Sequence, residues 1–334
     1  MRYTNLGKSN LKVSRICLGT MHFGNRTPED EAIRIMDRAL DMGINFWDTA
    51  NVYSGPGKLR GTSEAIIGRY FQAHNGSRDR VVLATKVNGP MEDVDDPNYD
   101  RGVSAYKVRK HVNDSLERLQ TDRIDLYQVH HIDRSITLEE FWGMFEKLVA
   151  DGKVLYVGSS NFPGWSLAKF QTAAMQRGFM GLISEQTMYN LLCRWPELEV
   201  LPAALDMGIG VIPYMPLAGG ILTAKVQSEA GSRTASVENE YGVSVSSDQI
   251  QAFQALCADL GESPVAVAIA WTLAQPAVSS AIVGIRTQEH LDEMERASEL
   301  DLDEETLKQL DEMFDTNKGR PIRTSRPAPE AYAW

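Results

Sequence analysis

Four titratable side chains lie at or just beyond the ends of short apolar runs. Asp48 lies in INFWDTA, Tyr53 is five residues further along, Lys86 ends VVLATK and His130 ends IDLYQVH. A polar group at the end of an apolar strand faces an opening rather than a packed core. An Asp, a Tyr, a Lys and a His that converge at one opening form a proton-transfer set.

These residue types suit the reduction of a carbonyl group. A free tyrosine has a pKa near 10 and donates poorly at neutral pH, so we expect the ammonium of Lys86 to lower the pKa of Tyr53. Asp48 would keep Lys86 charged and oriented. Tyr53 would then protonate a developing alkoxide, while His130 hydrogen-bonds the same oxygen. Neither group supplies a hydride, so a reductase built on this set also needs a nicotinamide cofactor.

Apolar runs alternate with helical patterns along the chain. The expected strands are residues 16–19, 45–48, 81–86, 126–130, 156–159, 182–186, 210–214 and 281–284. The expected helices are residues 27–42, a helix begun by Ser104, and residues 138–150, 166–177, 197–207, 264–274 and 289–297, with an extra helix at 303–315. Most of the strands are apolar on both faces, which is typical of parallel strands covered on each side. The alternation predicts an α/β (β/α)8 TIM barrel, formed by residues 1–334 as a single domain.

In such a barrel the chemistry lies where the carboxyl ends of the strands meet. Residues 2–6 and 11–13 flank the turn-rich GKSN and are expected to form a hairpin that closes the opposite end as a floor. Residues 88–102, 223–247 and the tail 317–334 are expected to be loops. The tail ends in AYAW and is either a lid over the pocket or a frayed terminus.

An open doubly wound sheet is the competing architecture. It would place a G-x-G-x-x-G turn after the first strand, but the first strand here runs into GTMHFG. The Gly55-Pro56-Gly57 run has Arg60 where the third glycine would stand. We therefore prefer the barrel.

Bulk properties exclude some partners. The 334 residues carry a formal net charge of −11, which disfavours binding to a phosphate backbone and so to nucleic acid. The N-terminus is too polar for a signal peptide, and no apolar stretch is long enough to cross a membrane. Three scattered cysteines, without a C-x-x-C pair, suit buried thiols in a reducing compartment. We expect a cytoplasmic protein that is a monomer or a small homo-oligomer.

The motifs in order resemble the aldo-keto reductase family over nearly the whole chain. The segments concerned are GINFWDTANVY at 43–53, GTSE at 61–64, ATK at 84–86 and DLYQVH at 125–130. By position, the catalytic tetrad of that family falls on Asp48, Tyr53, Lys86 and His130. The resemblance implies NADPH-dependent reduction of an aldehyde or ketone, with Tyr53 as the acid and a small-molecule carbonyl compound as the substrate.

The resemblance also implies cofactor and substrate contacts. Ser159 or Ser160, with Asn161 and Gln186, would hold the nicotinamide carboxamide, and Tyr214 would stack on its ring. Arg286 would bind the adenosine 2′-phosphate, helped by amides of the next helix, which favours NADPH over NADH. The other implied cofactor contacts are Gly19, Thr20, Met21, Asp48, Met215, Pro216, Leu217, Gly219, Gly284, His290, Glu293 and Met294. The implied substrate pocket is lined by His22, Phe23, Tyr53, His130 and Trp334.

Several positions depart from the family pattern. Met215 replaces a frequent Ser, and His290 and Met294 replace residues that usually contact adenosine, so NADH remains an alternative cofactor. The insertion at 54–60 is longer than usual, and the closing APEAYAW resembles bacterial tails. His131 beside His130 invites a metal site, but neighbouring strand residues point to opposite faces, so none is expected.

Two other functions stay open. Lys86 at a barrel strand end would also suit a Schiff-base lyase. Family members that act as channel-associated β subunits bind NADPH without rapid turnover, which gives a regulatory alternative. Sugars, keto-steroids, quinones and small aldehydes all remain candidate substrates.

Overall fold

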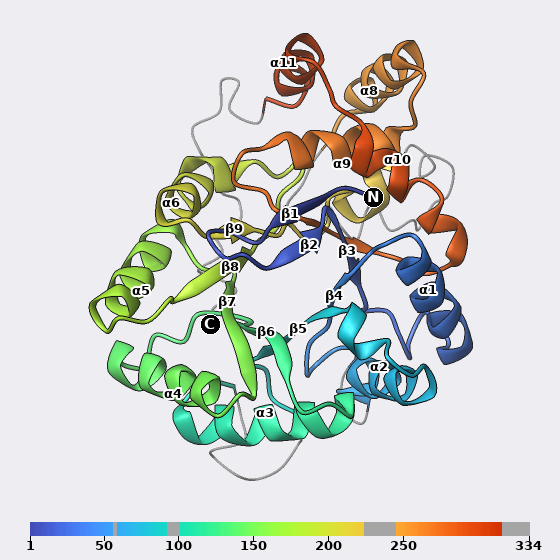
Figure 1. The fold of residues 1–334 in the computed structure, drawn as a ribbon. Helices are drawn as coiled ribbons and strands as arrows, with labels where there is room; N and C mark the ends of the chain where they lie inside the picture. Colours follow the sequence, from blue (N-terminus) through green and yellow to red (C-terminus); the bar gives the residue numbers. More distant parts are fainter. Residues whose placement is uncertain (56–58, 92–100, 224–244, 316–334) are drawn as a thin grey trace.

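Eight parallel strands form the centre of the computed structural model, which describes residues 1–55, 59–91, 101–223 and 245–315. The strands are β3 (Ile16–Gly19), β4 (Phe46–Asp48), β5 (Val82–Val87), β6 (Ile124–Val129), β7 (Val154–Ser160), β8 (Leu182–Gln186), β9 (Gly210–Val211) and β10 (Ala281–Gly284). They are arranged in chain order from β3 to β9, and β10 pairs with β3. The predicted (β/α)8 barrel is confirmed (Figure 1).

Backbone hydrogen bonds close the ring beyond the short β9. The amide of Val211 donates to the carbonyl of Ala277 at 2.8 Å, and the amide of Ile282 donates to the carbonyl of Pro213 at 2.8 Å. The sequence predicts a continuous strand at 210–214, but β9 ends at Val211. Pro213 has no N–H to contribute to a ladder, which accounts for the early end.

Helices surround this ring (Figure 1). They are α1 (Glu29–Asp41), α2 (Thr62–Ala73), α3 (Ala105–Leu119), α4 (Leu138–Ala150), α5 (Gly164–Gln176), α6 (Val200–Met207), α8 (Ser247–Leu260), α9 (Pro264–Ala274), α10 (Met294–Glu299) and the extra helix α11 (Glu304–Met313). Short 3-10 segments are η2 (Arg78–Arg80), η3 (Trp195–Leu198), η4 (Ala218–Thr223) and η5 (Gln288–Leu291). The hydroxyl of Ser104 accepts the amide of Lys107 and caps α3 as expected.

Two helical segments differ from the sequence prediction. The helix expected at 289–297 is instead the 3-10 segment η5 and, after it, the short helix α10. Helix α8 was not predicted at all, although Ser246 and Gln249 form a complete capping box at its start. Its buried residues Ile250, Phe253 and Cys257 also have helical spacing.

The predicted floor is present at the amino end of the barrel (Figure 1). Strands β1 (Tyr3–Asn5) and β2 (Lys12–Ser14) pair antiparallel, and Leu6 and Val13 are fully buried beside them. These two side chains join an apolar cluster inside the ring that also contains Cys17, Phe46, Ala84, Leu126, Ile183, Ile212 and Ile282. The hairpin therefore seals one end of the barrel and leaves the other for the site.

A larger apolar layer lies between the sheet and the helices. Trp47 belongs to it, as strand alternation predicted, and its ring stacks on Phe71 with centroids 5.9 Å apart. Most of the loops predicted at 88–102 and 223–247, and the whole tail 317–334, lie outside the described residues. Within the described ranges no single helix is long and apolar enough to span a membrane. Helices α8 and α9 reach that length and hydropathy only when taken together, and a bend of 91° separates them.

Candidate active site

Strand register brings the polar residues together at the open end of the barrel. Asp48 is the last residue of β4 and pairs in register with Ala84 of β5, while Lys86 pairs with Gln128 of β6. On each of these strands, the residue two positions earlier belongs to the apolar cluster inside the ring. Because strand side chains alternate, Asp48, Lys86 and Gln128 also point inward, one layer nearer the mouth.

Lys86 is the centre of the constellation. Its ammonium donates to Asp48 Oδ2 at 2.6 Å, to the Thr49 carbonyl at 2.9 Å and to the Tyr53 hydroxyl at 2.8 Å. These bonds use all three of its donors. The ring of His130 lies edge-on to that of Tyr53, with centroids 5.9 Å apart. The structure thus gathers all four residues that sequence reasoning selected.

Two amides complete the surroundings of Asp48. Gln186 donates to Asp48 Oδ1 at 2.8 Å, and Gln128 donates to the same oxygen at 3.1 Å. Asp48, Lys86 and both glutamines are at most 2% exposed. A buried ion pair of this kind needs hydrogen bonds at its remaining lone pairs, and the glutamines supply them.

The pKa of Tyr53 differs from the expectation in its net direction. Lys86 lowers this pKa, as expected, but burial raises it more, so the net shift is upward. Asp48 offsets part of the effect of Lys86, and the hydroxyl is desolvated. Burial alone would lower the pKa of Lys86, but Asp48 and Tyr53 reverse this and raise it. Tyr53 is therefore protonated and Lys86 is an ammonium at neutral pH.

His130 is neutral at the same pH. Burial lowers its pKa well below the usual value, and Lys86 and His131 lower it further. A neutral imidazole donates a hydrogen bond without competing as a proton source. The residue as a whole is partly exposed, and it lines the hollow at the mouth.

Asn161 links the tetrad to the expected cofactor side. Its Nδ2 donates to the His130 carbonyl at 3.2 Å, and its Oδ1 accepts the Tyr214 hydroxyl at 3.0 Å. Asn161 has a left-handed backbone with φ of 59°, and Met215 has φ of 57°. Non-glycine residues in this region are strained and occur often at functional sites.

The two candidate serines point in different directions. Ser159 donates to buried Glu185 outside the ring at 2.5 Å, whereas Ser160 Oγ accepts from Asn161 Nδ2 at 3.0 Å. Glu185 also accepts the Phe162 amide, so it holds both ends of the 159–162 segment. Burial raises the pKa of Glu185 to about 8. Sequence reasoning missed this residue.

The expected phosphate end of the cofactor lies at Arg286. Thr27 Oγ1 donates to the Arg286 carbonyl at 3.4 Å, and the Arg286 amide donates to His290 Nδ1 at 3.3 Å. The next element along the chain is the 3-10 segment η5, so the expected contribution of a helix N-terminus is not supported. Glu293 accepts the Ser263 hydroxyl. Met294 is 2% exposed and packs in the outer core, so we leave it out of the proposed cofactor contacts.

The other expected cofactor contacts lie at the mouth, either at the ends of β3 and β10 or in the loops beyond the strands. Thr20 Oγ1 donates to the Asp48 carbonyl at 3.0 Å, and Met21 is 52% exposed beside it. Gly219 and Gly220 have φ of 68° and 104°, so the backbone after Leu217 turns where side chains are disfavoured. The remaining positions in this group are Gly19, Met215, Pro216 and Gly284.

The substrate pocket differs from the expectation. Phe23 is fully buried in the outer core, because its loop folds back and its amide bonds to the Thr20 carbonyl. His22 lies next to Gly284 on the expected cofactor side, since a Cβ on that glycine would be 3.8 Å from its ring. Trp334 lies outside the described residues.

A hollow of about 260 Å³ lies beside the tetrad instead. Its lining residues are Val52, Arg60, Asn88, Gly89, Pro90, Arg101, His130 and His131. His130 lies beyond the end of β6, and its ring stacks on that of His131 at 5.0 Å. The prediction that the side chains of His130 and His131 point to opposite faces of a strand is therefore wrong. Among the described residues no group of three metal-ligating side chains converges.

Comparison with known proteins decides the family. A model of the Aldo/keto reductase family matches residues 15–315. The chain therefore belongs to the aldo/keto reductase family. It is 50% identical to the uncharacterized oxidoreductase YrpG of Bacillus subtilis (strain 168), over 100% of both chains.

Other relatives of this aldo/keto reductase have more specific names. It is 32% identical to versiconal hemiacetal acetate reductase of Aspergillus parasiticus, over 94% of this chain and 97% of that one. It is 31% identical to a probable voltage-gated potassium channel subunit beta of Arabidopsis thaliana, over 89% of this chain and 91% of that one. The chain is thus an oxidoreductase by family, acting on small molecules.

Some site residues of this aldo/keto reductase left a signal that sequence reasoning did not use. Gln128 precedes His130 by two residues, so strand alternation places it on the inner face with Leu126. Arg60 and Arg101 lie in or next to segments interpreted only as loops, and nothing in the sequence places them beside His130. Their position depends on how the loops fold.

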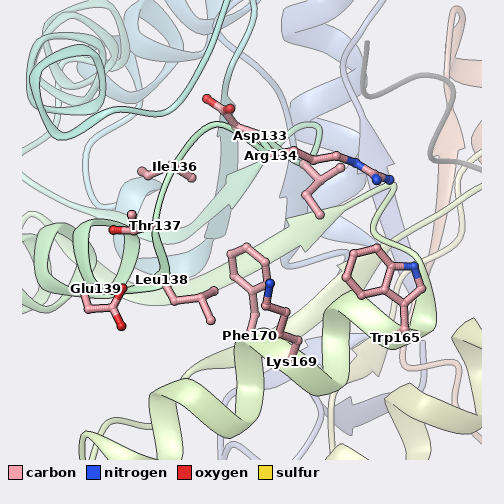
Figure 2. A pocket seen from close by; sticks show the side chains of 10 residues that line it. Asp133, Arg134, Ile136, Thr137, Leu138, Glu139, Trp165, Lys169 and Phe170 are labelled. Carbon is pink, nitrogen blue, oxygen red and sulfur yellow. The ribbon is translucent and has the colours of Figure 1, made fainter.

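A second hollow, of about 410 Å³, lies on the outer side between the loop after β6 and α5 (Figure 2). Trp165 and Phe170 form its apolar part, and the guanidinium of Arg134 lies 5.6 Å from the Trp165 ring centroid. None of the four tetrad residues lines it. The smaller hollow, which His130 lines, is therefore the one that adjoins the tetrad.

Proposed function

We propose that this protein reduces an aldehyde or ketone to an alcohol with NADPH. The observation that carries the proposal is the buried ammonium of Lys86, which bonds Asp48 at 2.6 Å and the Tyr53 hydroxyl at 2.8 Å. This arrangement suits proton donation to an oxygen at the mouth, and the carbonyl chemistry fits the oxidoreductase family.

Each residue of the tetrad has its own part in this reaction. The nicotinamide cofactor supplies the hydride. Tyr53 donates its proton to the carbonyl oxygen, and the ammonium of Lys86 stabilises the phenolate that remains. Neutral His130 donates a hydrogen bond to the same oxygen and fixes its direction. Asp48 with its two glutamine partners holds Lys86 in place.

The described residues fit a nicotinamide dinucleotide. Tyr214 presents a partly exposed ring whose hydroxyl is fixed by Asn161, which suits stacking. Ser160 and Asn161 offer polar groups for the carboxamide, whereas Ser159 is bound to Glu185 and Gln186 is bound to Asp48. Arg286 is only partly buried and offers a guanidinium for a 2′-phosphate, which supports NADPH over NADH.

The Schiff-base alternative is disfavoured by electrostatics. Imine formation needs a neutral amine, and enzymes obtain one by lowering the pKa of a lysine. Here the contacts to Asp48 and Tyr53 raise the pKa of Lys86. The similarity to a channel subunit beta supports a regulatory role. The complete tetrad favours catalytic turnover instead.

Three further properties stay proposals. We propose a single domain, a monomer or small homo-oligomer, and a cytoplasmic location. The location is supported by three buried thiols, Cys17, Cys193 and Cys257. Light scattering of the purified protein tests the oligomeric state.

Titration of the protein fluorescence with NADPH and with NADH tests the cofactor. We expect tight quenching by NADPH that Arg286→Ala weakens about 10- to 100-fold, the range of a charge-assisted hydrogen bond. Arg109→Ala is the matched control, because Arg109 is exposed on α3. Binding of NADH should be the same in all three proteins. If neither nucleotide binds the wild type, the reductase proposal fails, and trapping of Lys86 with borohydride becomes the next experiment.

A further inference from the structure

The last two residues of β8 point to opposite faces of the sheet, as strand alternation requires. Gln186 faces into the ring and donates to Asp48 Oδ1 at 2.8 Å. Glu185 therefore faces the outer layer, where it is fully buried. The same strand end thus holds the tetrad on one face and a second group on the other.

The carboxyl of Glu185 binds the chain at two points around the end of β7. Its Oε2 accepts the Ser159 hydroxyl at 2.5 Å, and its Oε1 accepts the Phe162 amide at 3.0 Å. Ser159 also pairs with Glu185 in the register of the sheet. Phe162 is fully buried, and its ring lies edge-on to that of Phe170, with centroids 5.2 Å apart. Both ends of the segment 159–162 are therefore fixed.

Asn161 lies between these two anchors, in a conformation that needs support. Its φ of 59° is left-handed, which costs free energy for a residue with a Cβ. Its Nδ2 donates to the His130 carbonyl at 3.2 Å, and its Oδ1 accepts the Tyr214 hydroxyl at 3.0 Å. A change in the backbone at Asn161 would therefore move side chains on the expected cofactor side of the mouth.

The hydrogen bonds of Glu185 do not require a negative charge. Burial raises the pKa of Glu185 to about 8, so its carboxyl is mostly neutral at pH 7. A glutamine has one acceptor oxygen and two N–H donors, so it can replace a neutral carboxyl. Ser159 Oγ could accept such an N–H, because it also has the Ser184 carbonyl, at 3.3 Å, as a place to donate.

We propose that Glu185 is a positioning residue, which sets the affinity for the nicotinamide end of the cofactor by fixing the backbone at Asn161. It acts through the segment 159–162 and does not touch the cofactor itself. The inference rests on the proposed function, in which Asn161 and Tyr214 meet the nicotinamide. The competing explanation is that Glu185 only stabilises the fold.

Calorimetric titrations with two ligands separate these explanations. One ligand is NADPH, and the other is adenosine 2′,5′-bisphosphate, which lacks the nicotinamide. Glu185→Met keeps the length of the side chain but removes both acceptor oxygens. We expect the Kd for NADPH to rise about 3- to 10-fold, the range of a lost hydrogen bond, and the Kd for the bisphosphate to stay within about twofold. A merely structural residue would change both constants or neither.

Two further variants serve as rescue and control. Glu185→Gln should keep both constants within about twofold of wild type, since its amide can still bond Phe162 and Ser159. Gln171→Met is the matched control, because Gln171 is 6% exposed and accepts the Leu182 amide at 2.8 Å. It thus holds the start of β8, at the end of the strand away from the mouth, and its loss should leave the ratio of the two constants unchanged.

Two results would overturn the inference. One is an unchanged ratio of the two constants in folded Glu185→Met, and the other is an equal weakening of NADPH binding by Glu185→Gln. If Glu185→Met does not fold, Glu185→Asp replaces it, because a side chain one methylene shorter cannot reach both anchors, and the same outcomes apply. If the wild type binds neither ligand, the proposed function fails, and the positioning role fails with it.

Failure of the positioning role alone has a different result. The wild type would then bind NADPH more tightly than the bisphosphate, and every folded variant at Glu185 would preserve that preference.

Discussion

Two layers of inward-facing side chains lie one above the other inside the barrel. On three neighbouring strands the lower residue is apolar and the residue two positions later is polar: Phe46 and Asp48, Ala84 and Lys86, and Leu126 and Gln128. Two strand residues span only about 6–7 Å, so the interior changes from hydrocarbon to an ion pair within one layer. The same strands thus provide both the closed core and the candidate active site.

The lower, apolar layer determines the environment of the upper, polar layer. The lower layer and the hairpin exclude water from beneath, so the Lys86–Asp48 pair is accessible only from the mouth. Electrostatic interactions are stronger where water is excluded, which explains why burial dominates the pKa of Tyr53 and why the pair needs Gln128 and Gln186 as partners. Substitutions in the upper layer should therefore affect the reaction, and those in the lower layer should affect stability.

The largest effect is expected at Tyr53, which the upper layer contacts through the ammonium of Lys86. Tyr53→Phe removes the proton donor but keeps the ring, so we expect kcat to fall about 10²–10⁴-fold, the usual contribution of general acid catalysis. Affinity for NADPH in the fluorescence titration should stay within about twofold of wild type. A variant that retained most of its turnover would show that another group donates the proton.

The lower layer should show the opposite pattern. Leu126→Ala leaves a cavity in the sealed core, so we expect the free energy of unfolding to fall by about 2–5 kcal/mol with kcat within about threefold of wild type at low temperature. Denaturant unfolding and kinetics measure the two quantities. Leu155→Ala is the control, because Leu155 is 42% exposed on β7 and should change stability by less than about 0.5 kcal/mol. A large loss of kcat in folded Leu126→Ala would show that the layers are not separable.

Glu185 tests the outer side of the mouth, where its buried carboxyl accepts hydrogen bonds from the Ser159 hydroxyl and the Phe162 amide. Its pKa is raised from 4.5 to about 8. Between these values the native state keeps the proton and the unfolded state releases it, so the free energy of unfolding falls as pH rises from about 4.5 to about 8. Below that window the group contributes no pH dependence.

Glu185→Gln removes this titration. Over pH 5 to 8, we expect wild type to lose roughly 2–4 kcal/mol more stability than Glu185→Gln, measured by denaturant unfolding at each pH. Glu139→Gln, at an exposed position on α4, is the control and should behave as wild type does. Parallel pH profiles for wild type and Glu185→Gln would mean that Glu185 is ionised in the native protein.

Local patterns predicted much of the fold. Apolar runs on both faces of each strand, separated by helical periodicity, required a parallel sheet covered on both sides, and the GKSN turn indicated the hairpin floor. The errors came where local chemistry was overlooked or overridden. Pro213 ended β9 early. The capping box at Ser246 marks the start of helix α8, at the end of the segment 223–247 that was interpreted as a loop.

The sequence by itself determined the four polar residues at the mouth, because their types and their places at strand ends depend only on local pattern. It also determined that Trp47 faces outward, because alternation along a strand is a local property. The tertiary structure decided which distant groups complete the site. Gln186 reaches Asp48 across 138 positions, and Arg60 and Arg101 line the same hollow as His130, only because barrel closure and loop folding bring them there. The structure also reversed the expected direction for the pKa of Tyr53, because desolvation depends on everything that surrounds a group and not on its neighbours in the chain.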